Sequence, residues 1–202
     1  MAITVTNKLD SLKTLFNSVK EIYYKSKALA SADLGGASLT MDMELPVLED
    51  GVSVNTGDAD VTNIKITTGA TWTTKAVKGD PDISFQVASV DGVINDLLLN
   101  KVDAAAVASA TALLDGVTYE GSGYSLAPKK VTGSLVMFSE DRQTIIILPN
   151  VEIYSSLVAA DGDNPAYFNV SVTPVENSEG ADIFILRKKV TAQGGSSDSG
   201  GE

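Results

Sequence analysis

The chain has 202 residues and a net charge of −11, from 26 acidic and 15 basic residues, and it contains neither cysteine nor histidine. The lack of cysteine excludes disulfides and thiolate chemistry, and the lack of histidine removes the usual general base and the commonest metal ligand. An acidic chain is also poorly suited to neutralise phosphates, which argues against tight wrapping of nucleic acid. With 44% hydrophobic residues, the chain is expected to form one globular domain with a proper core.

The first segment predicts an amphipathic helix over residues 7–29, because its large apolar residues recur every three or four positions. Residues 1–32 hold five lysines against two acids, so the outer face of this helix would be basic. Residues 1–37 are therefore either a helix with a solvated face or a basic arm that docks on an acidic neighbouring copy. The segment lacks an apolar leader and no run approaches a membrane span. We expect a mature chain that starts near Met1 and is made in the cytosol.

Residues 39–47 alternate apolar with polar side chains and predict a first strand, which an acidic loop follows at residues 49–60. The loop contains four acids and no basic residue, as a calcium loop would. However, its Asp58-Ala59-Asp60 sequence lacks the downstream bidentate glutamate, so we interpret the segment as a mobile connection. Val52 and Val54 are its only large apolar residues.

Residues 61–77 alternate over a longer distance and predict a half-buried strand rich in threonine. Ile64 and Trp72, the only tryptophan, would lie on its apolar face. Pro81 would end this strand, because proline has no amide N–H and fixes its own φ. Residues 83–87 alternate again, so we expect a hairpin of two long strands with one apolar and one polar wall.

The next segment predicts a short helix over residues 90–99, capped by Ser89 or Asp91 and packed on the sheet. For residues 101–119 two alternatives stay open, a loose alanine-rich helix or a hairpin that turns at Asp115-Gly116. The Gly- and Ser-rich end, residues 191–202, is expected to be disordered. Further strands are predicted at residues 130–139, 143–148 (buried on both faces), 151–157, 168–172 and 182–190.

No group of residues predicts catalysis or cofactor binding. Ser122 and Ser125 have no histidine to activate them, and pairs of acids such as Asp161 and Asp163 lie in predicted turns. We therefore expect no catalytic, cofactor-binding or metal-binding residue, and no enzyme.

This set of elements, a sandwich or barrel of about seven strands with one short helix on the sheet, resembles the major tail tube proteins of long-tailed phages. That fold is shared with contractile tail tubes and type VI secretion tubes. The resemblance covers roughly residues 38–190, and the N-terminal helix departs from it. It rests on the strand at 39–47, the loop at 49–60, the hairpin TWTTKAVKGDPDISFQV, the helix at 90–99 and the closing VTPVENSEGADIFILRKK.

The resemblance implies a structural virion protein, assembled in the cytoplasm of a bacterial host, whose rings (commonly hexameric) stack into a tube that conducts DNA without binding it specifically. Its partners would be further copies of itself and the tape measure, terminator and baseplate proteins. We expect Asp42 and Glu44 to face the lumen, where negative charge repels phosphates. We also expect Val52 and Val54, in the loop at 49–60, to make contacts between stacked rings. The alternatives are a β-sandwich adhesion or carbohydrate-binding module, or another tail component such as a terminator or baseplate hub.

Overall fold

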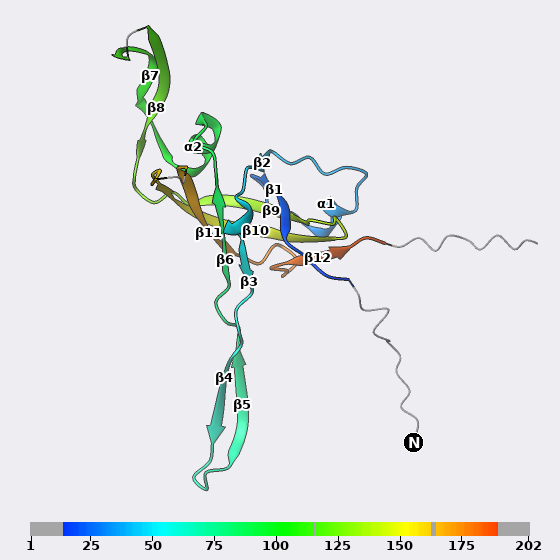
Figure 1. Ribbon diagram of the computed structural model, residues 1–202. Coiled ribbons are helices and arrows are strands. Elements are labelled where there is room, and N and C mark those ends of the chain that lie inside the picture. The colour runs from blue at the N-terminus through cyan, green and yellow to red at the C-terminus, as the bar shows by residue number, and fades with distance from the viewer. Residues whose placement is uncertain (1–13, 115, 163–164, 190–202) are drawn as a thin grey trace, which may run out of the picture.

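The computed structural model describes residues 14–114, 116–162 and 165–189, and within them the chain is mainly β-structure. One antiparallel sheet forms the body, and two pairs of strands stand apart from it as hairpins (Figure 1). In spatial order, the sheet contains β2 (Met43–Leu45), β1 (Val19–Lys25), β9 (Val131–Ser139), β10 (Thr144–Val158), β11 (Tyr167–Pro174), β6 (Asp82–Val87) and β3 (Ser53–Asn55), with β12 (Phe184–Arg187) also paired to β10.

The sheet closes into a barrel through the residues that follow β2. The Leu48 N–H donates to the carbonyl of Gln86 over 2.9 Å, and the Ala88 N–H donates to the carbonyl of Pro46 over 2.8 Å. These bonds join the end of β6 to the chain that leaves β2, and β3 pairs with the beginning of the same β6. Since β2 also pairs with β1, the barrel wall is continuous and leaves no long open edge there.

The barrel is filled by the inward-facing side chains of alternate residues. In β11, Phe168, Val170 and Val172 are buried while the residues between them are exposed, and β6 contributes three buried side chains in the same way. The helix α2 (Gly92–Leu98) adds Ile94 and Leu98 to this core. The predicted mainly β class, with one short helix packed on the sheet, is thus confirmed.

A smaller apolar cluster lies on the outer face of β9 and β10. It consists of Leu29, Val136 and Ile147, and the segment around the short helix α1 (Ser31–Leu34) packs against it. Leu148, the neighbour of Ile147, belongs to the inner core. The start of β10 is therefore buried on both faces, as its continuous apolar run predicted.

The predicted N-terminal helix is wrong over the part of it that the structure describes. Residues 19–25 form the strand β1, whose Ile22 and Tyr24 point into the core, and the only helix nearby is the four-residue α1. The apolar residues of this segment fit a period of two as well as a period of 3.6, and pairing with both β2 and β9 selects the strand. Residues 1–13 lie outside the described residues, and so does the tail at 191–202.

The predicted hairpin of residues 61–77 with residues 83–87 is also wrong. Residues 61–77 fold back on themselves as β4 (Asp60–Lys65) and β5 (Thr71–Val77), while β6 joins the barrel. The turn lies at residues 66–70, where Gly69 adopts a φ of 83° that favours glycine. In this register Ile64 lies opposite Thr73, and Ala76 opposite Val61, so no continuous apolar wall forms.

Other elements differ from the predicted ones in length or in where they begin and end. The first strand is reduced to the three residues of β2, and the predicted loop at residues 49–60 contains the 3₁₀ helix η2 (Glu49–Gly51) as well as β3. Residues 101–119 take the hairpin alternative, as β7 (Asn100–Leu114) and β8 (Val117–Ser125). The strands predicted at 143–148 and 151–157 are one strand, β10, with an irregularity between Leu148 and Val151.

Candidate functional site

The β4–β5 hairpin projects from the barrel as a bare two-stranded ribbon (Figure 1). Every side chain from residue 58 to residue 78 is exposed, including several large apolar ones. Trp72 is 72% exposed, which is exceptional for the largest apolar side chain in a protein. Apolar surface on a ribbon whose two faces are both open indicates a contact with another molecule.

Two glycines form the neck that joins this hairpin to the barrel. Gly57 and Gly79 lie on its two strands, and each passes close to the backbone of the opposite strand, at Asp80 and Asp58 respectively. The neighbouring Lys78 forms an ion pair with Asp182, close to the start of β12. The hairpin is therefore held at its base by close backbone packing and one ion pair.

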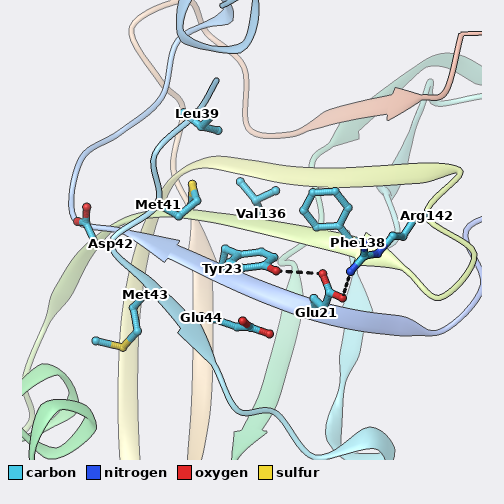
Figure 2. A pocket seen from close by; sticks show the side chains of 10 residues that line it. All are labelled: Glu21, Tyr23, Leu39, Met41, Asp42, Met43, Glu44, Val136, Phe138 and Arg142. Carbon is cyan, nitrogen blue, oxygen red and sulfur yellow. Dashed lines mark hydrogen bonds and ion pairs between the residues drawn. The ribbon is translucent and has the colours of Figure 1, made fainter. Parts of the chain in front are cut away.

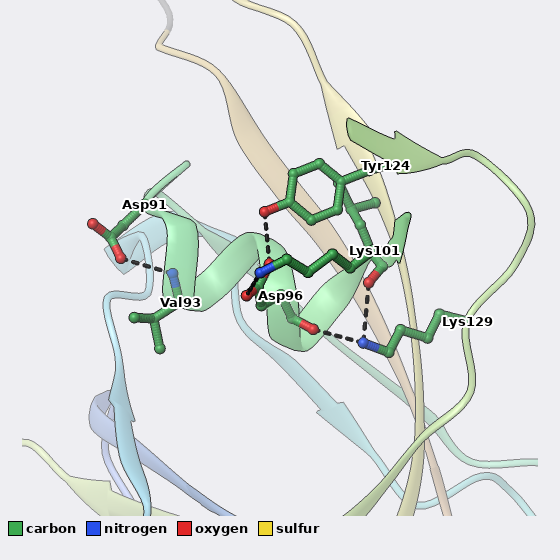
Figure 3. Close-up of polar contacts among 7 residues, drawn as sticks. Asp91, Val93, Asp96, Lys101, Tyr124 and Lys129 are labelled. Carbon is green, nitrogen blue, oxygen red and sulfur yellow. Dashed lines mark hydrogen bonds and ion pairs between the residues drawn. The ribbon is translucent and has the colours of Figure 1, made fainter. Parts of the chain in front are cut away.

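The β7–β8 hairpin leaves the barrel in the opposite direction and is fastened to α2 by a polar cluster (Figure 3). The Asp96 carboxylate accepts hydrogen bonds from Lys101 Nζ and Tyr124 Oη, each over 2.7 Å. Lys129 Nζ donates to the carbonyls of Asp96 and Leu99 at the end of the helix. The Lys101 ammonium, and then the Tyr124 hydroxyl, hold the pKa of Asp96 below its ordinary value.

A groove of about 560 Å³ lies on the outside of the barrel, between the segment of residues 39–44 and the strands β1 and β9 (Figure 2). Its floor is apolar. Tyr23 and Phe138 meet edge to face there, with ring centroids 5.8 Å apart. Met41 and Val136 point toward the same space. A concave apolar floor of this size is suited to one bulky side chain of a partner.

The rim of the groove is acidic. The carboxylate of Glu21 pairs with Arg142 and accepts a hydrogen bond from Tyr23, and these contacts lower its pKa. The hydroxyl of Ser26, and then its backbone N–H, lower the pKa of Asp42. Glu44 lies opposite Tyr23 in the β1–β2 pairing and is exposed. Three carboxylates against one guanidinium make the rim net negative.

The residues singled out from the sequence fall in two places. Asp42 and Glu44 both lie on the groove, and their predicted position in a lumen stays a prediction. Val52 and Val54 are half-buried and pack against the core of their own barrel, and their contact between rings also stays a prediction. The aromatic floor escaped the sequence analysis because β1, which supplies Tyr23, was interpreted as a helix.

Across the part of the chain that the structure describes, no group of three or more acidic side chains is placed to hold a metal ion. Within the same residues, no helix has the length and apolar character needed to cross a membrane.

Neither protein-family models nor curated protein sequences give a match to this chain. The function is therefore inferred from the hairpins and the groove.

Proposed function

We propose that the protein is a structural subunit that self-assembles into rings stacked as a phage tail tube. The observation that supports this is the pair of hairpins that leave the barrel in opposite directions. A two-stranded hairpin is marginally stable in water by itself, because it needs further strands or a packed face. Each hairpin is expected to find these in other copies of the chain.

The two hairpins differ in sequence and charge, so the contacts they make with neighbouring copies are heterologous. Residues 60–77 hold two lysines against one acid, whereas residues 100–125 hold one lysine against three acids. Heterologous contacts close into a ring when the rotation between copies permits it, and otherwise continue as a filament. A tube of stacked rings requires contacts of both kinds, around the ring and along the axis.

In this proposal the rings, commonly hexameric, form a conduit for DNA within the virion, and the protein is not an enzyme. The other partners are the tape measure, terminator and baseplate proteins. The net charge of −11 in each copy suits a conduit, because an acidic wall repels DNA phosphates and prevents specific binding.

The alternatives have less support. A carbohydrate-binding or adhesion module would need exposed aromatic side chains gathered on one face. Trp72 and Tyr119, both well exposed, instead lie on different hairpins that project in opposite directions. A terminator or baseplate hub of related fold would form a ring without continuing into a tube.

Negative-stain electron microscopy of the purified full chain, over a wide range of concentrations, tests the proposal. We expect tubes of stacked rings at high concentration. Single rings that never stack would favour the terminator or hub alternative. Particles that stay monomeric at every concentration, confirmed by light scattering, would contradict self-assembly.

A further inference from the structure

We infer that the acidic groove of one copy receives the Trp72 side chain on the β4–β5 hairpin of a second copy. This inference rests on the proposed self-assembly, and it names the two surfaces that meet. One is the groove between residues 39–44 and the strands β1 and β9, and the other is the hairpin at residues 60–77.

The topology places the hairpin and the groove of one molecule at different ends of the barrel. The hairpin joins the barrel at the beginning of β6, just before Asp82. The chain that borders the groove, from Met41 through β2, continues to Pro46 and Val47, which pair with Val87 and Ala88 at the end of β6. The hairpin also points away from the barrel (Figure 1). The hairpin therefore does not fill the groove of its own molecule, and in this inference the occupant is the hairpin of another copy.

Charge selects which hairpin of the second copy fits. Lys65 and Lys75 give β4–β5 a positive charge, and neither forms an ion pair with a residue that the structure describes. The rim of the groove offers Glu44 and Asp42 as partners. The β7–β8 hairpin is acidic, so docking it in the groove would place like charges together, which opposes association.

Trp72 supplies the bulky apolar side chain that would fill the groove. A tryptophan that fills a pocket at the centre of an interface typically contributes a large share of the binding energy. Its ring would lie against Tyr23 and Phe138, while Lys65, which pairs with Thr71 next to Trp72, reaches toward the carboxylates of the rim. Lys75 lies three residues from Trp72 along β5 and therefore on the opposite face of the ribbon. The hairpin thus carries an apolar anchor beside one cation, and the groove presents an apolar floor flanked by acids.

Because Trp72 is the only tryptophan, tryptophan fluorescence reports on the surroundings of this one side chain. The purified full chain would be followed through a concentration series by emission spectra and by sedimentation velocity. We expect the emission maximum to shift to shorter wavelength as the protein assembles, since Trp72 leaves water. An emission maximum that stays at the wavelength of a solvated tryptophan in assembled particles would overturn the inference.

Charge reversal tests the pairing. Glu44→Lys, and separately Lys65→Glu, should each raise the concentration required for assembly about tenfold or more, because like charges then meet. Combining the two changes should restore assembly. Glu176→Lys is the matched control, because it reverses an exposed acid that lies outside both hairpins and the groove, and it should have little effect.

The outcomes separate this inference from the proposed function. If tubes form and Glu44→Lys assembles like the wild type, or if Glu176→Lys weakens assembly as much as Glu44→Lys does, the groove is not the receptor although the proposed function stands. If the wild-type chain never assembles, both this inference and the proposed function are contradicted. A Trp72→Ala variant, compared with Tyr154→Ala on the barrel wall, should lose assembly while its thermal unfolding stays that of the wild type.

Discussion

Gly79 lies so close to Asp58 that a Cβ atom added to the glycine would be 1.9 Å from the carbonyl oxygen of the aspartate. On the opposite strand of the neck, a Cβ on Gly57 would be 2.5 Å from the carbonyl oxygen of Asp80, and Gly57 has a φ of 80°. The two strands that support the β4–β5 hairpin therefore touch backbone to backbone, which only glycine permits at these positions.

Replacing Gly79 by alanine is expected to separate the strands of this neck and loosen the hairpin. The barrel should remain folded, because its core lies beyond the neck. Amide hydrogen exchange and limited proteolysis, applied to residues 60–77, would measure the loss of order, and both rates should rise. Gly121→Ala in β8 is a matched control, since its Cβ would meet nothing within 4 Å. Equal protection of the hairpin in both variants would show that the neck tolerates a side chain.

The barrel has a comparable close approach at Gly133 in β9, where a Cβ would be 2.1 Å from the carbonyl oxygen of Lys25 in β1. Alanine there should push β1 away from β9 and lower the free energy of unfolding by roughly 1–3 kcal/mol, as overpacking of a core does. Urea denaturation of Gly133→Ala against the wild type would measure this. A free energy of unfolding within the error of the wild type would mean that β1 shifts without cost.

Truncating one fully buried and one largely exposed aromatic residue should change the free energy of unfolding by very different amounts. Phe168 is completely buried in the barrel, so Phe168→Ala is expected to lower the free energy of unfolding by roughly 3–5 kcal/mol. Trp72→Ala removes a side chain that is 72% exposed, and should change this free energy by less than about 0.5 kcal/mol. Chemical denaturation of the dilute protein provides both values. A large loss for Trp72→Ala would place Trp72 in a folded core, as the sequence interpretation had it.

The contrast between Trp72 and Phe168 shows which parts of the fold could be predicted. The strand around Phe168 alternates buried and exposed residues, and this pattern follows from the pleat of a half-buried strand. The segment around Trp72 alternates too, but its apolar side chains face solvent, because no other element of the barrel covers them. Periodicity reports that a strand has two different faces, and it carries no information on what covers either face.

The groove could not be predicted from the sequence, for a related reason. Its rim residues Asp42 and Glu44 were recognised as exposed acids, but its floor needs Tyr23 beside Phe138, which are far apart in sequence. Only the antiparallel register of β1 with β9, in which Glu21 lies opposite Phe138, brings the floor together. Pairing between distant strands is a property of the whole chain and leaves no local signal.

Asp96 is expected to control the attachment of the β7–β8 hairpin. Asp96→Asn removes the charge that holds Lys101 and weakens the hydrogen bond from Tyr124, so the base of the hairpin should open more often. Amide exchange at residues 100–125 should accelerate, while the melting temperature of the barrel changes little, because exposed ion pairs contribute little to stability. Glu120→Gln, an exposed acid on the same hairpin, is the control. Unchanged exchange in Asp96→Asn would mean that the two contacts of Lys129 suffice.

The ion pair between Glu21 and Arg142 should make the free energy of unfolding of the barrel depend on pH in the acidic range. The Arg142 guanidinium, followed by the Tyr23 hydroxyl, lowers the pKa of Glu21 in the folded protein. A carboxylate whose folded pKa is lowered stabilises the fold fully above its unfolded pKa, about 4.3, and this contribution disappears as the pH falls through the folded pKa. The difference in free energy of unfolding between wild type and Glu21→Gln should therefore be constant near neutral pH and shrink at acidic pH.

Arg142 provides the control for this measurement, because its guanidinium is the largest cause of the shift. In an Arg142→Gln background, the same Glu21→Gln change should show a much weaker dependence on pH, since only the Tyr23 hydrogen bond and the smaller effect of the Lys20 charge remain to lower the pKa of Glu21. Urea denaturation of the four proteins between neutral pH and about pH 3, a range that spans the unfolded pKa of glutamate, would supply the comparison. An identical pH dependence in both backgrounds would show that Arg142 does not determine the ionisation of Glu21, and the lowered pKa of Glu21 would then need another origin.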